Sequence, residues 1–294
     1  MIISRIKKGL YDIFPSWMVK QSCRNKNYPY ALDLSNPRTF NEKIKWMSTH
    51  YRNPLYTRCA DKVSVQGYVE EKLGKEVADS LFCTKYGVWE HVEDIDIETL
   101  PNSFVFKSNH ASGHVILCED KTKLDWVQTK VTLNNWLRTN FFYMHGEWQY
   151  KNIKPKIICE ELLDADIIDY RIFCFGGKPE YIKVTKHNNE SKGGYDCALY
   201  YPDWTETEFT LAQNYGYLSV PKPADLDTML EIARKLSKDF SFVRVDLYSV
   251  SGRTYFAELT FTPNSGCEWF TDESVDLRFG EMFKLPKDQY VKRW

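Results

Sequence analysis

Two alternating segments near the C-terminus, joined by a short turn, constrain the fold of this chain more than any other feature. Residues 242–247 read Phe-Val-Arg-Val-Asp-Leu, and residues 255–261 read Tyr-Phe-Ala-Glu-Leu-Thr-Phe. The intervening Ser251-Gly252 is typical of tight hairpin turns. Because side chains alternate along a strand, Arg244 and Asp246 share one face of the predicted hairpin, and apolar side chains occupy the other.

The predicted hairpin places two carboxylates opposite each other. A turn at Ser251-Gly252 implies a register in which paired residue numbers sum to about 504, so Asp246 lies opposite Glu258. The same register places Arg244 opposite Thr260. Like charges directly across a ladder are destabilising unless a cation lies between them. Mg²⁺ prefers carboxylate and phosphate oxygens, so the pair predicts a magnesium site. The alternative is a solvated sheet face with a slipped register.

Composition excludes several classes of protein. Only 14 of the 294 residues are glycine, and neither G-x-G-x-x-G nor G-x-x-x-x-G-K-[ST] occurs, which excludes the two familiar glycine-rich phosphate sites. The 39 Lys and Arg residues balance 40 Asp and Glu residues, so a general nucleic-acid backbone binder is excluded. A hydrophobic content of 43% is too high for a disordered chain. Any nucleotide site must therefore hold phosphate in another way.

The N-terminal quarter of the chain reads as helical, over residues 1–75. Thr39-Phe40-Asn41-Glu42 is a capping box that opens one helix. Asn53-Pro54 opens a second helix, which we expect to carry Lys62 and to end at Gly74.

From about residue 80 the pattern changes to strands mixed with helices. The expected elements are strands at 104–107, 156–162, 170–175 and 180–185, helices at about 124–141 and 224–240, and the hairpin at 242–261. Hairpins mixed with helices indicate an α+β fold with largely antiparallel sheets.

Cysteine usage indicates a reducing compartment. The eight cysteines include no C-x-x-C pair, and several lie inside apolar strand-like runs, as Cys159 and Cys174 do. A chain of this length with such a core needs no disulfide framework, so we expect reduced thiols and a cytoplasmic location. No apolar stretch reaches the roughly 18 residues of a membrane span.

An apolar stripe marks the N-terminus. Ile3, Ile6, Leu10, Ile13 and Trp17 recur at helical spacing with basic residues between them. We expect this helix to pack on the body of the protein, and peripheral contact with a membrane surface is the alternative.

Two further segments favour a nucleotide site. Lys107 ends an apolar strand and precedes the loop Ser108–His114, a geometry suited to gripping phosphate through an ammonium and backbone N–H groups. Glu160-Glu161 closes the next strand and precedes Leu162-Leu163, where acidic and backbone groups can hold an adenine. An ordinary strand-end lysine and a solvated charge pair are the alternatives.

Eight short segments carry a resemblance to a known family. They are Asn36–Lys43, Asn53–Tyr56, Ala60–Lys62, Lys107–Gly113, Glu147–Pro155, Asp169–Arg171, Val243–Leu247 and Glu258–Pro263. Their order resembles ATP-grasp enzymes, and more closely the TupA-like ATP-grasp family, named for teichuronopeptide synthesis. The resemblance implies two α+β subdomains clasping a nucleotide after a helical N-terminal region. The expected boundaries are 1–75 for that region, 76–160 for the subdomain with the phosphate loop and 161–294 for the subdomain with the metal site.

The resemblance also implies ATP and Mg²⁺ as cofactors and a role for each matching residue. Arg244 and Lys107 are the implied catalytic cations. The residues implied to hold the nucleotide are Lys62, Lys107, His110, Ser112, Gly113, Glu160, Glu161, Leu163 and Asp169. Asp246 and Glu258 are the implied metal ligands. Many ATP-grasp enzymes have Asn two residues after that Glu, where this chain has Thr260, so either Thr260 or Asn264 is the third candidate.

The chemistry implied by the resemblance is amide formation. A carboxylate attacks the γ-phosphate of ATP, and an amine then displaces phosphate from the resulting acyl phosphate. No protein nucleophile is needed, which fits the absence of a Ser/His/Asp or Cys/His pattern. The implied partners are a small-molecule or saccharide carboxylate and an amine, in cell-surface polysaccharide synthesis, with no nucleic acid.

Substrate residues are predicted on the hairpin at 169–187. Arg171, Lys183, Lys186 and His187 are candidates for an acidic substrate pocket, with exposed strand lysines as the alternative. Aromatic residues at 200, 201 and 204 are candidates for stacking on a sugar or for the core.

Three other functions stay open. D-x-D occurs at residues 94–96, 164–166 and 225–227, as in metal-dependent glycosyltransferases. An ATP-dependent kinase on the same fold and a non-catalytic binding module are the others. His110, His114 and Cys118 suggest zinc, but the glycine-containing loop between the histidines argues against a helical ligand pair.

Overall fold

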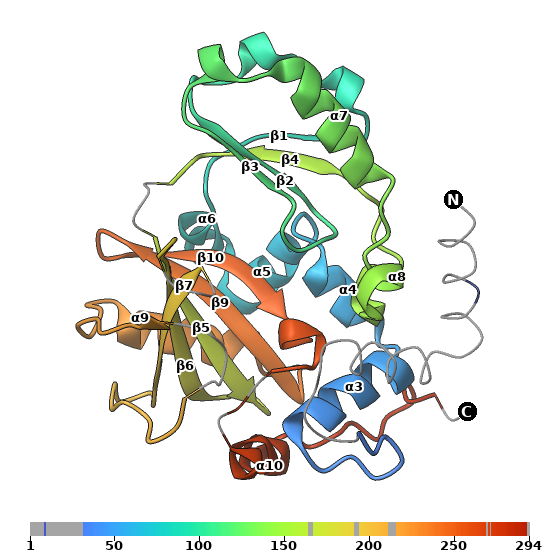
Figure 1. Cartoon of the computed structure of the whole chain (residues 1–294), viewed down its shortest axis with the longest axis vertical. Coiled ribbons are helices and arrows are strands. Elements are labelled where there is room, and N and C mark those ends of the chain that lie inside the picture. The colour runs from blue at the N-terminus through green and yellow to red at the C-terminus, as the bar shows by residue number, and fades with distance from the viewer. Residues whose placement is uncertain are drawn as a thin grey trace.

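The computed structural model describes residue 9 and residues 32–163, 167–190, 194–210, 216–268, 270 and 272–292. It contains two sheets stacked along the long axis of the molecule (Figure 1). The small sheet has the strand order β1-β4-β2-β3, and the large sheet has the order β10-β9-β5-β6-β7-β8. The predicted N-terminal helix and its membrane alternative lie outside the described residues.

The helices and strands have the following bounds. The helices are α3 (Phe40–His50), α4 (Pro54–Ala60), α5 (Val65–Leu73), α6 (Lys75–Leu81), α7 (Trp126–Leu137), α8 (Phe142–His145), α9 (Leu226–Leu236) and α10 (Glu273–Met282). The strands are β1 (Lys85–Trp89), β2 (Phe104–Ser108), β3 (Val115–Cys118), β4 (Ile157–Glu160), β5 (Ile168–Phe175), β6 (Lys178–His187), β7 (Tyr195–Tyr200), β8 (Gly216–Tyr217), β9 (Phe242–Val250) and β10 (Arg253–Thr260).

These elements confirm the α+β prediction. Both sheets are antiparallel except for the short β7–β8 pair. The helices predicted at about 124–141 and 224–240 are present within narrower bounds, and the strands predicted at 170–175 and 180–185 are longer than predicted. No helix in the described part of the chain is long and apolar enough to cross a membrane. The division at residues 76 and 161 stays a prediction.

The small sheet has one buried face and one open face. Phe104 and Phe106 of β2 alternate with Val105 and Lys107, and the phenylalanines pack with Leu133 of α7 in a separate core cluster. Because successive side chains point to opposite faces, Val105 and Lys107 face away from α7.

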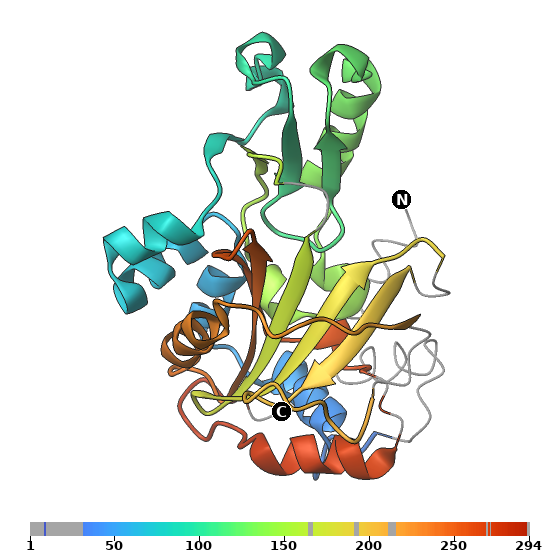
Figure 2. The ribbon, with the colours of Figure 1, turned by 90° about the vertical axis from the view of Figure 1, so that its left-hand side faces the viewer.

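The large sheet is covered on both faces, but one covering is incomplete. Helix α9 packs against β5, β6 and β9 on one face (Figure 2). On the other face Phe40 of α3 and Phe279 of α10 pack against Phe173 and Phe242. This aromatic layer covers the sheet only at the Phe173 end and leaves the ends of β5 and β6 near Arg171 and Lys183 open.

Capping explains where α3 begins and corrects one prediction. Thr39 and Glu42 form the predicted capping box. The second helix, however, does not carry Lys62, because α4 ends at Ala60 and the chain turns before α5. The Asp61 carboxylate accepts the backbone N–H of Val63 at 2.9 Å, and such a local bond competes with helix continuation. Gly74 ends α5 with φ of 85°, as predicted.

The C-terminal hairpin has the predicted pairs, with an added irregularity. Ser251 and Gly252 have φ of 52° and 76°, as a two-residue primed turn requires. Near the turn Phe256 pairs with Leu247, and beyond it Glu258 pairs with Asp246. The extra residue between these pairs, residue 257, is a bulge. The predicted pairs of Asp246 with Glu258 and of Arg244 with Thr260 are therefore confirmed.

Because the aromatic layer is tightly packed, we expect truncation of one of its side chains to lower stability strongly. Phe40 is fully buried and contacts six other rings, so Phe40→Ala is expected to lower the free energy of unfolding by about 3–5 kcal/mol. Chemical denaturation followed by circular dichroism measures this loss. Tyr217→Ala, at a side chain 67% exposed, is the control and is expected within about 0.5 kcal/mol of wild type. Equal losses in the two variants contradict this account of the core.

Candidate functional site

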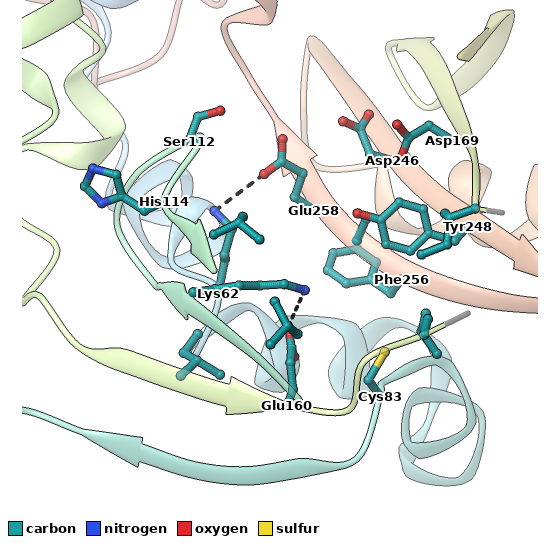
Figure 3. A pocket seen from close by; sticks show the side chains of 18 of the residues that line it. Lys62, Cys83, Ser112, His114, Glu160, Asp169, Asp246, Tyr248, Phe256 and Glu258 are labelled. Atoms are coloured by element: carbon teal, nitrogen blue, oxygen red, sulfur yellow. Dashed lines mark ion pairs between the residues drawn. The ribbon is translucent and has the colours of Figure 1, made fainter. Parts of the chain in front are cut away.

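A cavity of about 570 Å³ lies between the two sheets. Its walls come from the open face of the small sheet, the open part of the large sheet, and the segments at residues 62–65, 82–85 and 111–114. Figure 3 shows Asp246, Asp169 and Tyr248 on the side of the large sheet, and Glu160 and Cys83 across the cavity. This volume is in the range of small-molecule sites.

Four charged residues form one row across the large sheet. Glu258 of β10 pairs with Asp246 of β9, Asp246 pairs with Arg171 of β5, and Arg171 pairs with Lys183 of β6. Directly paired residues project from the same face, and neighbouring strands lie about 4.8 Å apart, so the row spans about 14 Å. All four residues line the cavity, with the negative members at one end and the positive members at the other.

The negative end of the row is tied together by hydrogen bonds. Arg244 donates to both Asp246 oxygens, at 2.7 Å from Nε to Oδ1 and 2.6 Å from Nη2 to Oδ2. The Thr260 hydroxyl lies 3.1 Å from Asp246 Oδ2 and 2.8 Å from Glu258 Oε1. A single hydroxyl thus joins the two predicted metal-ligating carboxylates.

Electrostatics favours the charged forms of Arg244 and Glu258, whereas burial raises the pKa of Asp246. Burial alone would lower the pKa of Arg244, but Asp246 and its hydrogen bonds outweigh burial and raise it. Burial alone would raise the pKa of Glu258, but Lys62 and Arg244 outweigh it and lower the pKa. Arg244 is therefore a cation and Glu258 an anion at neutral pH.

Lys62 connects the loop after β2 to this network. Its backbone N–H donates to Asn109 O at 3.1 Å, and its Nζ donates to Ala111 O at 2.9 Å. The same Nζ lies 3.6 Å from Glu258 Oε2 (Figure 3). Asn109 in turn donates to the Asp61 carboxylate at 2.9 Å. The turn after α4, at Asp61 and Lys62, thus binds the loop after β2 and places the Lys62 ammonium beside Glu258.

The predicted phosphate loop faces the cavity with most of its residues. Lys107, Ser112 and Gly113 line the cavity, and Gly113 has φ of 76°. The Lys107 Nζ forms an ion pair with Glu160 Oε1 at 2.5 Å.

His110 is placed differently from the prediction. It is buried, its Nε2 is 3.0 Å from Thr139 O, its Nδ1 is 3.1 Å from Asn109 Oδ1, and it does not line the cavity. His114 lines the cavity in its place, stacked on Trp136 at a centroid distance of 4.9 Å. The residues that the structure describes include no group of three or more His, Cys, Asp or Glu side chains arranged to hold a metal.

The predicted adenine and ribose residues lie together. Glu160, Glu161 and Leu163 line the cavity beside Cys83. Asp169 also lines it, and its Oδ2 accepts a hydrogen bond from Arg171 at 2.9 Å.

The predicted substrate residues separate into two groups. Arg171 and Lys183 line the cavity. His187 is exposed at the end of β6, where its ring packs edge-on against Tyr195, and it does not line the cavity. Trp204 stacks on Tyr200 at a centroid distance of 4.3 Å, so one face of its indole is already covered.

The two D-x-D segments among the described residues, at 94–96 and 225–227, do not line the cavity. Asp225 accepts hydrogen bonds from Ser249 and Thr254, and thereby joins the start of α9 to the β9–β10 hairpin. The segment at 94–96 lies in the turns before β2, and the segment at 164–166 lies outside the described residues.

Sequence reasoning missed Glu268, and it named Asn264 only as an alternative metal ligand. Both line the cavity on the turn that follows β10. No alternating pattern or short motif marks Glu268, and its partner Lys183 lies 85 residues away. The only signal was its closeness in sequence to the Glu258–Pro263 segment.

His114 provides a test of the loop geometry. Burial, with smaller contributions from His110 and Lys62, lowers the pKa of His114 to about 4. An NMR titration is expected to show one imidazole signal with a midpoint near this value, which disappears in His114→Gln. Since the unfolded chain then binds more protons, His114 lowers stability as the pH falls from its ordinary pKa of 6.5 toward 4. A midpoint for His114 at or above its ordinary value contradicts the packing described.

Comparison with known proteins gives one match to a family model. The model described as TupA-like ATPgrasp matches residues 42–284. No curated protein sequence matches the chain. The chain is similar to a D-alanine–D-alanine ligase from Bacillus anthracis complexed with ATP, at 14% identity and a TM-score of 0.43, over 90% of this chain and 72% of that one. It is also similar to an L-amino acid ligase from Bacillus licheniformis, at 13% identity and a TM-score of 0.41, over 90% of this chain and 55% of that one. The family match alone carries the assignment.

Proposed function

Because the chain belongs to the TupA-like ATP-grasp family, as its sequence predicted, we propose that it is an ATP-dependent ligase that joins a carboxylate to an amine. The observation that carries the proposal is the cavity itself. It holds two carboxylates, Asp246 and Glu258, facing the two lysines Lys62 and Lys107. Carboxylates for a metal and ammonium groups for phosphates are the parts that binding of a metal nucleotide requires.

The nucleotide is proposed to lie between the two sheets. Its adenine end is held by Glu160, Glu161 and Leu163, which lie at the end of β4 among the apolar walls of the cavity. Asp169 is proposed to receive the ribose hydroxyls. The phosphates lie against Lys62, Lys107, Ser112 and Gly113, with His114 rather than His110 as the neighbouring imidazole.

The residues at the negative end of the row fit a magnesium ion. Asp246 and Glu258 supply carboxylate oxygens, and the Thr260 hydroxyl between them supplies a third oxygen. This oxygen-only set suits a hard cation. When bound, Mg²⁺ neutralises charge on the phosphates of ATP.

The protein's own cations are proposed to guide both steps. In the first step a carboxylate oxygen of the acid attacks the γ-phosphorus of ATP, the bond to ADP breaks, and an acyl phosphate forms. In the second step an amine nitrogen attacks the acyl carbon, inorganic phosphate leaves, and one proton is released. Negative charge grows on phosphoryl and then acyl oxygens. Arg244 and Lys107 are already charged and held in place, so they stabilise that charge without reorganising.

The acid is proposed to lie over Arg171 and Lys183, next to the metal-ligating residues. Arg171 and Lys183 are cations paired with Asp169 and Glu268, and their guanidinium and ammonium groups suit the carboxylate of a uronic acid or an acidic polymer. The family relationship supports a role in cell-surface polysaccharide synthesis. The free thiols of the described cysteines support a cytoplasmic location.

Product analysis tests this function. The full chain is incubated with MgATP, a uronic acid and a panel of amino acids. Release of ADP and phosphate that requires both an acid and an amine is expected. Release of UDP or GDP from a nucleotide sugar without use of ATP contradicts the ligase and favours a glycosyltransferase. Formation of a stable phosphorylated product favours a kinase.

Substitution of the carboxylates tests the metal site. Glu258→Gln and Asp246→Asn are each expected to lower kcat by at least about 100-fold, because each removes an anionic oxygen from the site. Asp246 also neutralises buried Arg244, so its substitution is expected to lower the melting temperature as well. Glu258, whose side chain is 30% exposed, is the cleaner test. Glu180→Gln, outside the cavity lining, is the matched control. Wild-type turnover in Glu258→Gln excludes the metal site described.

A further inference from the structure

At the positive end of the charge row, Lys183 and Glu268 form a buried ion pair that the proposed nucleotide and metal sites do not use. Lys183 Nζ lies 3.0 Å from Glu268 Oε1, and the two side chains are only 3% and 2% exposed. Both residues nevertheless line the cavity. Burying an ion pair carries a desolvation cost, and apolar replacements are often as stable. This pair is therefore poorly explained by stability alone.

One oxygen of Glu268 is available for a ligand. Its Oε1 accepts from Lys183, whereas its Oε2 has no hydrogen-bond partner among the described residues. No fully buried polar side-chain atom of the described residues lacks a partner, so Oε2 is not sealed in the core. Glu268 lines the cavity and its Oε1 is bound to Lys183, so we infer that Oε2 is the oxygen that its side chain presents there. An acceptor with free lone pairs in such a place requires a donor.

The backbone of Glu268 is held rigidly in this position. Its N–H donates to Asn41 Oδ1 at 2.8 Å, and its C=O accepts from Asn41 Nδ2 at 2.8 Å. Asn41 is itself fixed by Asp276 of α10, which accepts from its backbone N–H and its Nδ2, each at 3.0 Å. Helices α3 and α10 thus hold the backbone of Glu268 in place at the cavity wall.

The turn before Glu268 is shaped to reach this position. Asn264, Ser265 and Gly266 all have left-handed φ, of 46°, 55° and 67°. Left-handed backbone at non-glycine residues is costly and persists where the surroundings enforce it. Ser265 Oγ donates to Glu147 at 2.6 Å, and a Cβ at Gly266 would lie 2.8 Å from Ile44. The turn is therefore fixed against α3 and against the segment before β4.

The charges around Glu268 favour a cationic donor. Arg171 and Arg244 each form their ion pair with another carboxylate, Asp169 and Asp246, so neither is seen to form an ion pair with Glu268. When the phosphates of ATP or an acyl phosphate occupy the cavity, its net charge becomes more negative. An ammonium group then gains from both the free oxygen of Glu268 and the bound anions.

We propose that Glu268 binds the amine substrate, accepting a hydrogen bond from a primary ammonium group at Oε2. This inference rests on the proposed ligase function and adds the residue that selects the amine. Lys183 holds the other oxygen and fixes the orientation of the carboxylate.

Glu268 acts as a binding group rather than as a base. Burial alone would raise its pKa, but Lys183 and Arg244 outweigh burial and lower it. A carboxylate with a lowered pKa is a weak proton acceptor. The ammonium therefore loses its proton to solvent before its nitrogen attacks the acyl carbon.

A comparison of two nucleophiles tests the proposal. The full chain is incubated with MgATP and D-glucuronate, and the nucleophile is either hydroxylamine, which is uncharged at neutral pH, or a primary amine from the series glycine, L-alanine, L-lysine and L-glutamate. Hydroxamate and amide are quantified separately. Glu268→Gln is expected to raise KM for the ammonium substrate at least about tenfold, as expected for loss of a charge-assisted hydrogen bond, and to change KM for hydroxylamine less than about threefold.

Two further variants separate binding from folding. Glu268→Asp keeps the charge and is expected to bind the amine more tightly than Glu268→Gln. Glu281→Gln, at an exposed carboxylate on α10, is the matched control and is expected to match wild type. Thermal melting and KM for MgATP report whether each variant is folded.

Failure of the proposed ligase function and failure of the proposed role of Glu268 give different results. If wild type forms neither hydroxamate nor amide, the ligase function fails and the amine assignment fails with it. If wild type forms both products and Glu268→Gln keeps the wild-type KM for the amine, only the role of Glu268 is overturned. If Glu268→Gln instead raises KM for D-glucuronate, the residue contacts the acid, and the proposal is again wrong.

Discussion

The cavity depends on one inserted residue in the β9–β10 hairpin. With the register set by the turn at Ser251-Gly252, Glu258 would lie opposite Val245, on the face of the sheet away from the cavity. The bulge between Phe256 and Glu258 shifts the pairing by one residue, so that Glu258 lies opposite Asp246 on the cavity face. The carboxylates of Asp246 and Glu258 then lie side by side. Their repulsion is unfavourable unless a cation lies between them. The row that continues to Arg171 starts from this pair.

Ion pairs between side chains of opposite charge explain how so many charged residues can line one cavity. Arg244 is paired with Asp246, Lys107 with Glu160, and Lys183 with Glu268. Each pair holds its two side chains against each other at the cavity wall. The aromatic layer formed by α3 and α10 supports this arrangement by packing the adjacent half of the same sheet face. That layer ends before the part of the face where the row lies.

The hairpin and its charged face could be predicted from the sequence because strand alternation and a glycine turn are local signals. The count of about 504 predicted the pair of Asp246 with Glu258, but the pairs next to the turn sum to 503, so the predicted pair depends on the bulge, which has no sequence signature. Local signals failed where distant contacts decide the outcome. His110 turns into the protein because Thr139 and Asn109 engage its ring, and Glu268 reaches the cavity because residues 85 and 227 positions away hold it.

Transfer of oxygen from acid to phosphate tests the central claim most directly. When an acid labelled with ¹⁸O in its carboxylate is turned over with MgATP and an amine, attack of the carboxylate on the γ-phosphorus places one labelled oxygen in the phosphate that leaves. Mass spectrometry of the released inorganic phosphate is expected to show one ¹⁸O per molecule formed. Unlabelled phosphate, formed in step with the amide, contradicts an acyl phosphate and with it the account of Arg244, Lys107 and the paired carboxylates.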